Sequence, residues 1–564
     1  MTSTSQLCQS DLFKKRSELL SRDARVVLSY DRAKAIGLAF GITFNDILNL
    51  TQNFWDIHTH PNMVLDGAAC TLLTIQYNLV AGTLAKYAAT TRPDLISLVE
   101  DILRWDVIGQ FCLTELGRGI DIFRMKTSVT LLPTGEFDLH TPSPSDAKFM
   151  PPTIPMKGLP CVAVVFAQLY VDGECRGPRP FLVNINDGYD MCSGVTSMRT
   201  YCSMTRLLPP RGGSSPVNHA LTSFHHVRLP PSALLGDLTK SNTIHHDFMS
   251  SIWRVMVGSL ALSSLAIPYL RVGSFVAARY FQRRHVTSLQ GNPVPIISYR
   301  TQQLPLLHAI AQAFVLRALH KWAIEQFMDN NLDVRVRHGI AACCKAVMIQ
   351  HAQVANYVLS ERLGAQGLFE YNQLSNFYSE MRGVSIAEGD ILALSMRLVA
   401  DTLSQTYELP VSTHPDGPLA MHEISLFDEA TETVFSSSDF TQAFMQYVQP
   451  RCQLMVESMG HRMACDAAVD QGVPQCLVDL YLINAIKTDA AWYVEHGVFT
   501  RKAIVHMEDA ALSAALPRLE ELLTAMEVEP YVSSPIISDK CWEEFSKTLP
   551  VYSSPQAQVP AARL

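Results

Sequence analysis

Hydrophobic and polar positions change their spacing along the chain, and the first 108 residues have the spacing of helices. Residues 70–85 form a long, largely apolar stretch with a helical repeat, which predicts a buried helix. Thr43 precedes another apolar stretch, where a hydroxyl side chain is expected to cap the first turn of a helix. Residues 1–108 are therefore predicted to be an N-terminal helical domain.

The pattern changes to short strands over residues 109–240. Residues 128–132 and 136–140 flank a Pro-Thr-Gly turn, which is typical of a hairpin. A longer apolar strand is predicted over residues 162–171 and ends at an Asp-Gly turn. This block is predicted to be a β domain with proline at its joints.

The helical repeat returns over residues 241–407, which are predicted to be a helical bundle domain. Apolar faces recur over residues 248–289, 303–328, 336–363 and 388–406. Residues 408–438, rich in proline, glycine and serine, are predicted to be a linker. Residues 439–564 are predicted to form a C-terminal helical domain with a loose tail. The expected fold class is α+β, mainly α.

Composition narrows the class of protein. The chain has 564 residues, 48% of them hydrophobic, enough for a large folded core. Its net charge of −8 gives no basic excess of the kind that binds nucleic acid. Thirteen cysteines without a Cys-x-x-Cys pair favour free thiols in a reducing compartment. The apolar run 255–270 is shorter than the roughly 20 residues of a membrane span and predicts a buried helix.

Common motifs for nucleotide, hydrolase and zinc chemistry are missing from the sequence. It contains no Gly-x-Gly-x-x-Gly after a strand, no phosphate loop, no Gly-x-Ser-x-Gly and no His-Glu-x-x-His. Histidine pairs occur at 225–226 and 245–246, and a His-x-His at 58–60, but neither cysteines nor carboxylates accompany them in a ligand pattern. These histidines are expected to be packing or solvent-facing residues, and no metal site is predicted.

The first boundary between helices and strands carries a more specific signal. Residues 111–121 read Phe-Cys-Leu-Thr-Glu-Leu-Gly-Arg-Gly-Ile-Asp. This resembles the flavin loop of the acyl-CoA oxidase and acyl-CoA dehydrogenase superfamily, and is closer to the oxidase branch. The resemblance implies that Thr114 offers polar groups to the flavin. Gly117 and Gly119 would let the backbone approach the ring system.

A second segment resembles the same family. Residues 147–151, Ala-Lys-Phe-Met-Pro, lie where the family has a strand whose backbone flanks the flavin, which implies contacts from Phe149, Met150 and Pro151. Glycines usually follow this proline in the oxidases, whereas Pro152 follows here. Pro152 has no N–H to donate to the cofactor.

Further matches follow in family order along the helical block. The resemblance implies that Arg283 reaches the cofactor pyrophosphate across a dimer interface. Residues 299–303 resemble the oxidase Tyr-x-Thr-Gln-Gln segment and imply contacts from Arg300 and Gln303. Residues 363–367 resemble a glycine turn that meets the neighbouring subunit's flavin adenine dinucleotide (FAD), which implies contacts from Gln366 and Gly367.

The last match carries the chemistry. Residues 387–391, Ala-Glu-Gly-Asp-Ile, resemble the oxidase Tyr-Glu-Gly-Asp-Asn motif. The resemblance implies that Glu388 is the base that removes the α-proton of an acyl thioester. Ile391 replaces the usual asparagine, so one polar contact to the cofactor would be missing. A carboxylate in the first turn of a helix is the plainer interpretation of Glu388 taken alone.

Together the motifs imply an FAD-dependent acyl-CoA oxidase. The implied architecture is N-terminal helices, a β barrel, a helical bundle and an extra C-terminal helical domain, in a homodimer that reoxidises its flavin with oxygen. The ending Ala562-Arg563-Leu564 resembles a peroxisomal address, read by the import receptor. Pro152 and Ile391 keep two alternatives open: a tailoring oxidase or desaturase on the same scaffold, and a flavin-poor partner subunit.

Overall fold

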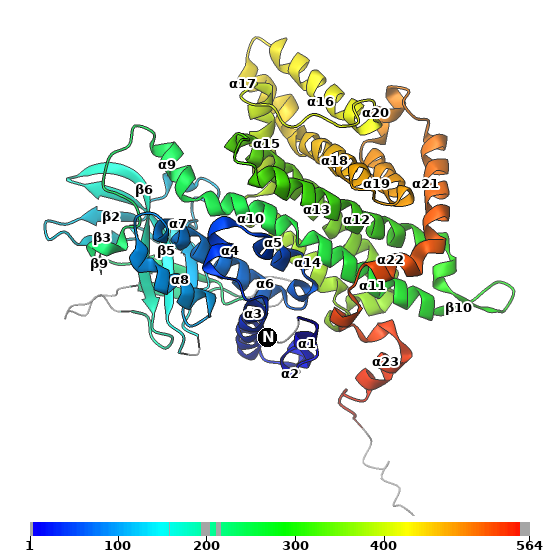
Figure 1. Cartoon of the computed structure of the whole chain (residues 1–564), viewed down its shortest axis with the longest axis horizontal. Coiled ribbons are helices and arrows are strands. Elements are labelled where there is room, and N and C mark those ends of the chain that lie inside the picture. The colour runs from blue at the N-terminus through cyan, green and yellow to red at the C-terminus, as the bar shows by residue number, and fades with distance from the viewer. Residues whose placement is uncertain (1–3, 157, 193–202, 210–215, 553–564) are drawn as a thin grey trace, which may run out of the picture.

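The computed structural model describes residues 4–156, 158–192, 203–209 and 216–552. The strands β2, β3, β5, β6 and β9 gather at one end of the molecule, on the left in Figure 1, and helices fill the centre and most of the other end, where the β10 strand projects. The N-terminal helices lie against both regions. The expected mainly helical α+β fold is confirmed, with a β domain between two helical regions.

The N-terminal region is helical up to the first strand. Its helices are α1 Thr4–Cys8, α2 Asp11–Lys14, α3 Arg22–Phe40, α4 Phe44–Asn49, α5 Gln52–Thr59, α6 Gly67–Thr74, α7 Gly82–Ala88 and α8 Ile96–Leu103. A π-helical segment, Ile75–Ala81, joins α6 to α7, so the predicted long buried helix is present. Thr43 caps α4 in a reciprocal capping box with Asp46.

The main sheet has six strands in the order β1-β5-β2-β3-β9, with β6 pairing on β5. Its strands are β1 Ile108–Cys112, β2 Ser128–Leu131, β3 Phe137–His140, β5 Cys161–Val171, β6 Glu174–Asn186 and β9 Val227–Leu229. The predicted hairpin of β2 and β3 is confirmed, as is the Asp172-Gly173 turn after β5. Both turn residues have positive φ angles, which such a tight turn requires.

A second, three-stranded sheet has the order β4-β8-β7. Its strands are β4 Lys148–Phe149, β7 Ser203–Leu207 and β8 Ala220–Phe224. Because β8 continues through a short turn into β9, the two sheets are joined at this corner.

The bundle domain is built from long helices. They are α9 Ile244–Ser251, α10 Trp253–Ser263, α11 Ala266–Arg283, α12 Arg300–Met328, α13 Val334–Arg362, α14 Leu374–Ile386 and α15 Ile391–Leu403, with a β10–β11 hairpin (His285–Thr287, Pro293–Pro295) before α12. Two expectations need correction. The sequence did not predict α14, and the helix predicted from residue 388 begins at Ile391, because the Asp390 side chain caps it.

The predicted linker over residues 408–438 is wrong for most of its length. It contains α16, Pro418–Phe435, which begins with a proline in its first turn and buries an apolar face against α18. Helices continue as α17 Phe440–Ala443, α18 Cys452–Asp470, α19 Gln475–Thr488, α20 Ala490–Glu495, α21 Arg501–Ala515 and α22 Leu519–Ala525. The region predicted as a loose tail includes α23, Asp539–Ser546.

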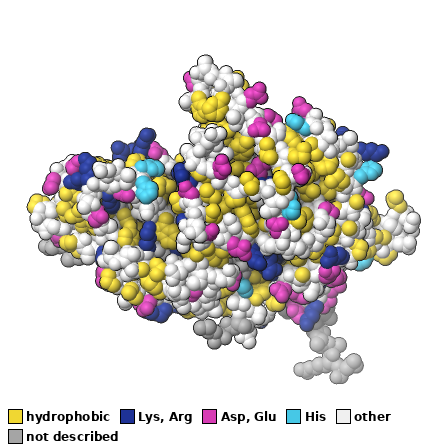
Figure 2. Space-filling view, turned by 45° about the horizontal axis from the view of Figure 1, so that its top comes forward, with side chains coloured by type: hydrophobic (Ala, Val, Ile, Leu, Met, Phe, Trp, Pro, Cys, Tyr) yellow, Lys and Arg dark blue, Asp and Glu magenta, His cyan; other side chains and the backbone are white. Residues whose placement is uncertain are grey.

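In the described part of the chain, two helical stretches are long and apolar enough to cross a membrane by length and composition, Gly67–Ala88 and Trp253–Arg283. Most of each is buried inside the protein, as core helices are. On the face shown in Figure 2, charged side chains of both signs are interspersed among hydrophobic ones, without an extended field of one sign. This matches the absence of a basic excess in the sequence.

Candidate active site

Glu388 lies in the short connection between α14 and α15, not inside a helix. Its φ angle is 54°, in the left-handed region that residues with side chains rarely adopt, and Gly389 follows at φ 107°. Asp390 accepts a hydrogen bond of 3.0 Å from the amide of Ala393 and thereby starts α15. Such strained conformations persist where the surroundings hold them, and they concentrate at functional sites.

The Glu388 carboxylate turns inward to groups that are far away in the sequence. Asn78 Nδ2 donates a 2.9 Å hydrogen bond to Glu388 Oε2 and a 3.0 Å bond to the carbonyl of Arg254. Gly258 on α10 faces the carboxylate, and a Cβ atom at this position would lie 1.2 Å from Glu388 Oε2. Only glycine leaves room for the carboxylate here.

The main chain around Glu388 is held by two polar side chains. Lys345, a buried residue of α13, donates from Nζ to the carbonyl oxygens of Ala387 and Gly389. Ser259 donates from Oγ to the carbonyl of Glu388 itself. These hydrogen bonds fix the carbonyls of residues 387, 388 and 389, and they account for the positive φ angles of this connection.

Burial dominates the electrostatics of this cluster. It raises the pKa of Glu388 to about 8, against the opposing effects of Lys345, Arg254 and Asn78. Burial also lowers the pKa of Lys345 to about 8 and that of Arg254 to about 9. A carboxylate with a pKa in the working range is suited to accept and release a proton.

The sequence-based interpretation missed Asn78, Arg254, Gly258, Ser259 and Lys345. Three of them carry a signal that could have been used, since they are polar residues set inside apolar stretches. Lys345 stands within the run Ile-Ala-Ala-Cys-Cys-Lys-Ala-Val-Met-Ile, and Arg254 and Asn78 lie in similar surroundings. A charge at such a position is rarely buried without a partner.

The two segments predicted to flank a flavin lie side by side. The amide of Phe149 donates to the carbonyl of Thr114 at 2.9 Å, and the amide of Gly117 donates to the carbonyl of Ser145 at 2.7 Å. The antiparallel pairing therefore brings residues 114–117 beside residues 145–149, although about 30 residues separate them.

A buried ion pair joins these segments. Lys148 Nζ lies 3.2 Å from Glu115 Oε1, and both side chains are fully buried. Glu115 also accepts hydrogen bonds from the amides of Lys126 and Thr127, each at 2.8 Å. Glu115 and Lys148 therefore hold the loop in place and are not available to a ligand.

The predicted glycines of the loop are exposed. Gly119 has a φ angle of 52° and open space where a Cβ would stand, whereas a Cβ on Gly117 would lie 3.1 Å from Ser145. Leu116 and Ile120, beside them, are exposed apolar side chains. Of the other predicted contacts, Phe149 and Met150 are partly buried and Pro151 is buried.

The predicted arginines are paired within the chain. Arg283, at the end of α11, pairs with Asp539 through Nε and donates from Nη1 to the carbonyl of Ile536 at 3.1 Å. Arg300, at the start of α12, pairs with Asp509 at 2.7 Å and contacts Gln303 Oε1 at 2.9 Å. None of these contacts connects the arginines to the Glu388 cluster.

Gln366 and Gly367 lie in a 3₁₀ turn after α13. Gln366 accepts hydrogen bonds from Asn372 through both its side chain and its carbonyl, at 2.9 and 2.8 Å. A Cβ on Gly367 would lie 1.8 Å from the carbonyl oxygen of Ser360, so the turn requires glycine. Leu368 and Phe369, which follow, are exposed.

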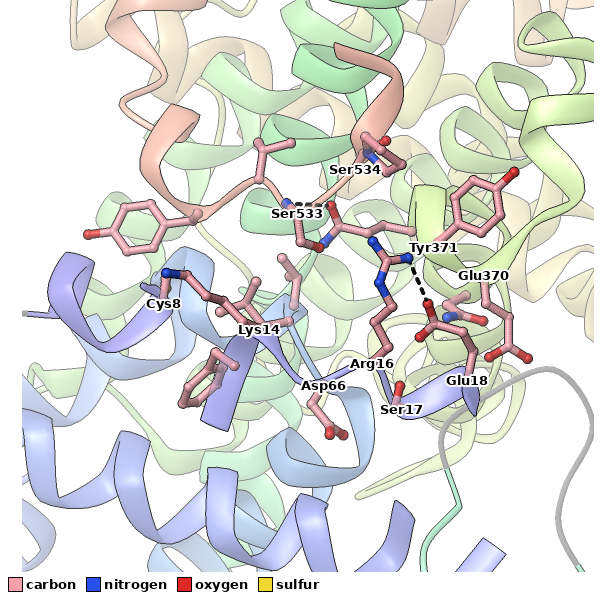
Figure 3. Close-up of a pocket in the computed structure, with 18 of the residues that line it drawn as sticks. Cys8, Lys14, Arg16, Ser17, Glu18, Asp66, Glu370, Tyr371, Ser533 and Ser534 are labelled. Carbon is pink, nitrogen blue, oxygen red and sulfur yellow. Dashed lines mark hydrogen bonds and ion pairs between the residues drawn. The ribbon is translucent and has the colours of Figure 1, made fainter. Parts of the chain in front are cut away.

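A cavity of about 460 Å³ lies away from Glu388, between the N-terminal segment and residues 530–548 (Figure 3). Arg16 and Glu18 pair at 3.4 Å on its wall, and the amide of Ser533 donates to Gln373 Oε1 at 3.3 Å. Its lining contains none of the predicted site residues. Acidic and basic side chains both line the cavity, so its charge does not indicate a particular class of ligand.

Comparison with known proteins agrees with this layout. Residues 255–402, which carry Glu388 and the predicted arginines, match the family model "Acyl-CoA oxidase, C-alpha1 domain". The crystal structure of acyl-coA oxidase1 from Yarrowia lipolytica superposes with a TM-score of 0.82 at 15% identity, covering 97% of this chain and 89% of that one. The chain has the acyl-CoA oxidase fold. The resemblance predicted from the motifs is thereby confirmed.

Two further relatives refine the comparison. Acyl-CoA oxidase-1 from Caenorhabditis elegans, complexed with FAD and ATP, has a TM-score of 0.76 at 16% identity, covering 97% of this chain and 90% of that one. Peroxisomal acyl-coenzyme A oxidase 3 of Homo sapiens is 29% identical over 281 residues, which are 47% of this chain and 38% of that protein. The sequence match thus spans well under half of the human acyl-CoA oxidase.

Proposed function

We propose that this protein is an FAD-dependent acyl-CoA oxidase, which desaturates an acyl thioester between Cα and Cβ. The observation that carries the proposal is the Glu388 carboxylate, buried with a raised pKa and held by Asn78 within an acyl-CoA oxidase fold. Removal of a proton next to a thioester carbonyl needs a base of this kind.

The loop beside β4 fits a flat, partly apolar cofactor. Gly119 leaves its surroundings open, and the exposed Leu116 and Ile120 offer apolar surface for a ring system. We assign Thr114, Gly117, Gly119 and residues 149–151 to FAD on this basis. When bound, FAD supplies the acceptor for the hydride that leaves Cβ.

Glu388 provides the proton chemistry. Asn78 donates a hydrogen bond to Oε2 of Glu388, and no described residue donates one to Oε1. We therefore assign Oε1 as the oxygen that accepts the α-proton. Lys345 and Ser259 hold the neighbouring carbonyls, which orients the main chain and points the carboxylate inward. The Glu388 amide has no acceptor in the described part of the chain, and we assign it to the substrate carbonyl, whose negative charge grows in the transition state.

A homodimer accounts for the remaining predicted contacts. Arg283, Arg300, Gln303, Gln366 and Gly367 lie outside the Glu388 cluster, so they would serve the cofactor of a second copy. The exposed apolar side chains of Leu368 and Phe369, directly after the glycine turn, support a partner surface there.

We also propose that the protein works in peroxisomes and that oxygen reoxidises the flavin. The human relative is named as a peroxisomal acyl-coenzyme A oxidase. The ending Ala562-Arg563-Leu564 lies outside the described residues and remains a prediction. A fluorescent fusion that loses its peroxisomal pattern when these three residues are replaced would support the assignment, and an unchanged pattern would contradict it.

The proposed activity is tested by the visible spectrum of the purified protein. Saturated acyl-CoAs of several chain lengths are added without oxygen, and air is then admitted. The proposal expects flavin bands that bleach with an acyl-CoA and recover rapidly in air. A yellow protein that bleaches with none of them would favour a tailoring enzyme on this scaffold. A colourless protein would favour a non-catalytic partner subunit.

The base is tested with Glu388→Gln, which keeps the shape of the side chain and removes the carboxylate. The variant is expected to bind FAD normally and to lose flavin reduction by at least about a thousandfold. Glu457→Gln is the matched control, because burial raises the pKa of Glu457 too, in a helix of the C-terminal region. Reduction at the normal rate in Glu388→Gln would remove this residue from the mechanism.

A further inference from the structure

Three histidines meet at the corner where the two sheets join. His140 ends β3, while His225 and His226 form the turn between β8 and β9, some 85 residues later. Since β9 pairs antiparallel with β3, through Leu139 and Val227, the turn folds over the end of β3. One ring nitrogen of each histidine lies within 4.8 Å of those of the other two.

The rings are close enough to share one ion. The rings of His140 and His226 are stacked, with centroids 4.2 Å apart and planes inclined by 14°, and the centroids of His225 and His226 are 4.9 Å apart. Stacked rings direct their nitrogen lone pairs in parallel, so the exposed rings of His225 and His226 turn towards a common point when they bind one ion. Three imidazoles on two segments are the donor set of a zinc site with an open fourth position.

An aspartate orients one of these rings. His226 Nδ1 lies 3.0 Å from Asp138 Oδ2, two residues before His140 on β3. A carboxylate in this position holds the proton on Nδ1 and leaves Nε2 as a lone-pair donor. Carboxylate partners of this kind accompany the histidine ligands of metal sites and fix their tautomer.

His140 is also placed to act as a metal ligand. Its Nδ1 is buried and has no hydrogen-bond partner among the described residues. An imidazole nitrogen without a hydrogen-bond partner is free to coordinate a metal ion.

We propose that His140, His225 and His226 bind a divalent transition-metal ion of the Zn²⁺ class, with Asp138 orienting His226. The ion ties the end of β3 to the β8–β9 turn and stabilises this corner of the β domain. It keeps one coordination position for water. No metal site was predicted from the sequence, because the His225-His226 pair has no third ligand nearby in the chain. The fold brings His140 to this pair.

The test is calorimetric titration of the full-length, FAD-loaded protein with zinc chloride. The wild type is expected to bind one Zn²⁺ per chain, and His140→Ala to weaken binding at least tenfold. Asp138→Asn is expected to weaken it about 10- to 100-fold without removing a ligand. The double substitution His245→Ala/His246→Ala is the matched control, because it removes two adjacent exposed histidines elsewhere and should leave the affinity within twofold.

X-ray absorption of the zinc-loaded protein gives an independent readout, with about three nitrogen ligands at roughly 2.0–2.1 Å expected. Where His140→Ala folds poorly by circular dichroism, the exposed pair His225→Ala/His226→Ala decides the matter. Absence of stoichiometric binding by the wild type would overturn the proposal. So would equal affinity in the ligand variants, or equal loss in the His245/His246 control.

Discussion

The Oε2 atom of Glu388 accepts a 2.9 Å hydrogen bond from Nδ2 of Asn78, a residue 310 positions earlier in the chain. Asn78 lies in the π-helical segment between α6 and α7, and its own carbonyl accepts a 2.9 Å bond from Arg254 Nε. π-Helical turns often occur at functional sites because they redirect a side chain. Here the turn aims an amide from the N-terminal region at a carboxylate of the bundle.

Because Asn78 favours the charged form of Glu388, its removal is expected to change the pH profile. Ionised Glu388 is the active base, so the rate of flavin reduction should rise with pH through about 8. Asn78→Leu removes a hydrogen bond that lowers the pKa of Glu388, and this limb should move to higher pH. Stopped-flow reduction between pH 6 and 10 measures the shift. An unchanged limb would show that Asn78 does not act on the ionisation of Glu388.

Gly258→Ala tests the close approach of the carboxylate to α10. The new Cβ would fall 1.2 Å from Glu388 Oε2, so the carboxylate must move while the helix keeps its fold. A displacement of about 1 Å at a reacting group costs on the order of 100-fold in rate, with FAD content unchanged. Gly236→Ala is the control, since a Cβ there meets nothing nearer than 3.9 Å. Full activity in Gly258→Ala would contradict the geometry of this contact.

Burial of Glu388 also predicts a cost in stability. Its pKa rises from 4.5 to about 8 on folding, so the folded protein retains a proton that the unfolded chain releases between these values. Stability should therefore fall as pH rises through this window. Glu388→Gln stays neutral and avoids the loss, which predicts a gain on the order of 2–4 kcal/mol at pH 9 and little change at pH 4.5.

Thermal unfolding of both proteins at the two pH values measures this difference. Glu361→Gln, on an exposed carboxylate at the end of α13, is expected to change nothing at either pH. A Glu388→Gln variant that is less stable than the wild type at pH 9 would mean that the neighbouring cations more than repay the burial of the charge.

Regular periodicity made most of the fold predictable. The β2–β3 hairpin, the Asp172-Gly173 turn and the buried helix over residues 70–85 depend on local patterns, and all three are present. Helix α16 was missed because its flanks are rich in proline, glycine and serine, which outweighed its apolar face. Local propensity does not separate a loop from a helix whose stability comes mainly from packing against neighbouring helices.

The same contrast between local pattern and long-range packing applies to the candidate site. Glu388 was reached through a motif of five adjacent residues, which a sequence displays directly. Asn78, Gly258 and Lys345 come from three different helical segments, and no local sequence pattern predicts that they lie together around Glu388. Their roles arise from packing, because the opening that Gly258 leaves is defined only when α10 lies against residue 388.

Arg283 offers a test of the two-subunit cofactor site. In its pair with Asp539, 80% of the aspartate side chain is accessible to solvent, so the pair contributes little to stability. A pyrophosphate held by a planar guanidinium binds more strongly than an exposed carboxylate does. Arg283→Gln is therefore expected to weaken FAD binding about 10- to 100-fold, with the thermal unfolding of the apoprotein nearly unchanged.

Asp539→Asn removes the same ion pair from the other side and serves as the matched control. If Arg283 binds the cofactor, this variant keeps or improves FAD affinity, because a competing carboxylate is gone. If Arg283 only anchors the segment around α23, both variants should lower stability equally and leave FAD affinity alike. Fluorescence titration of FAD into the apoproteins separates these outcomes, since only a cofactor contact makes the two substitutions diverge.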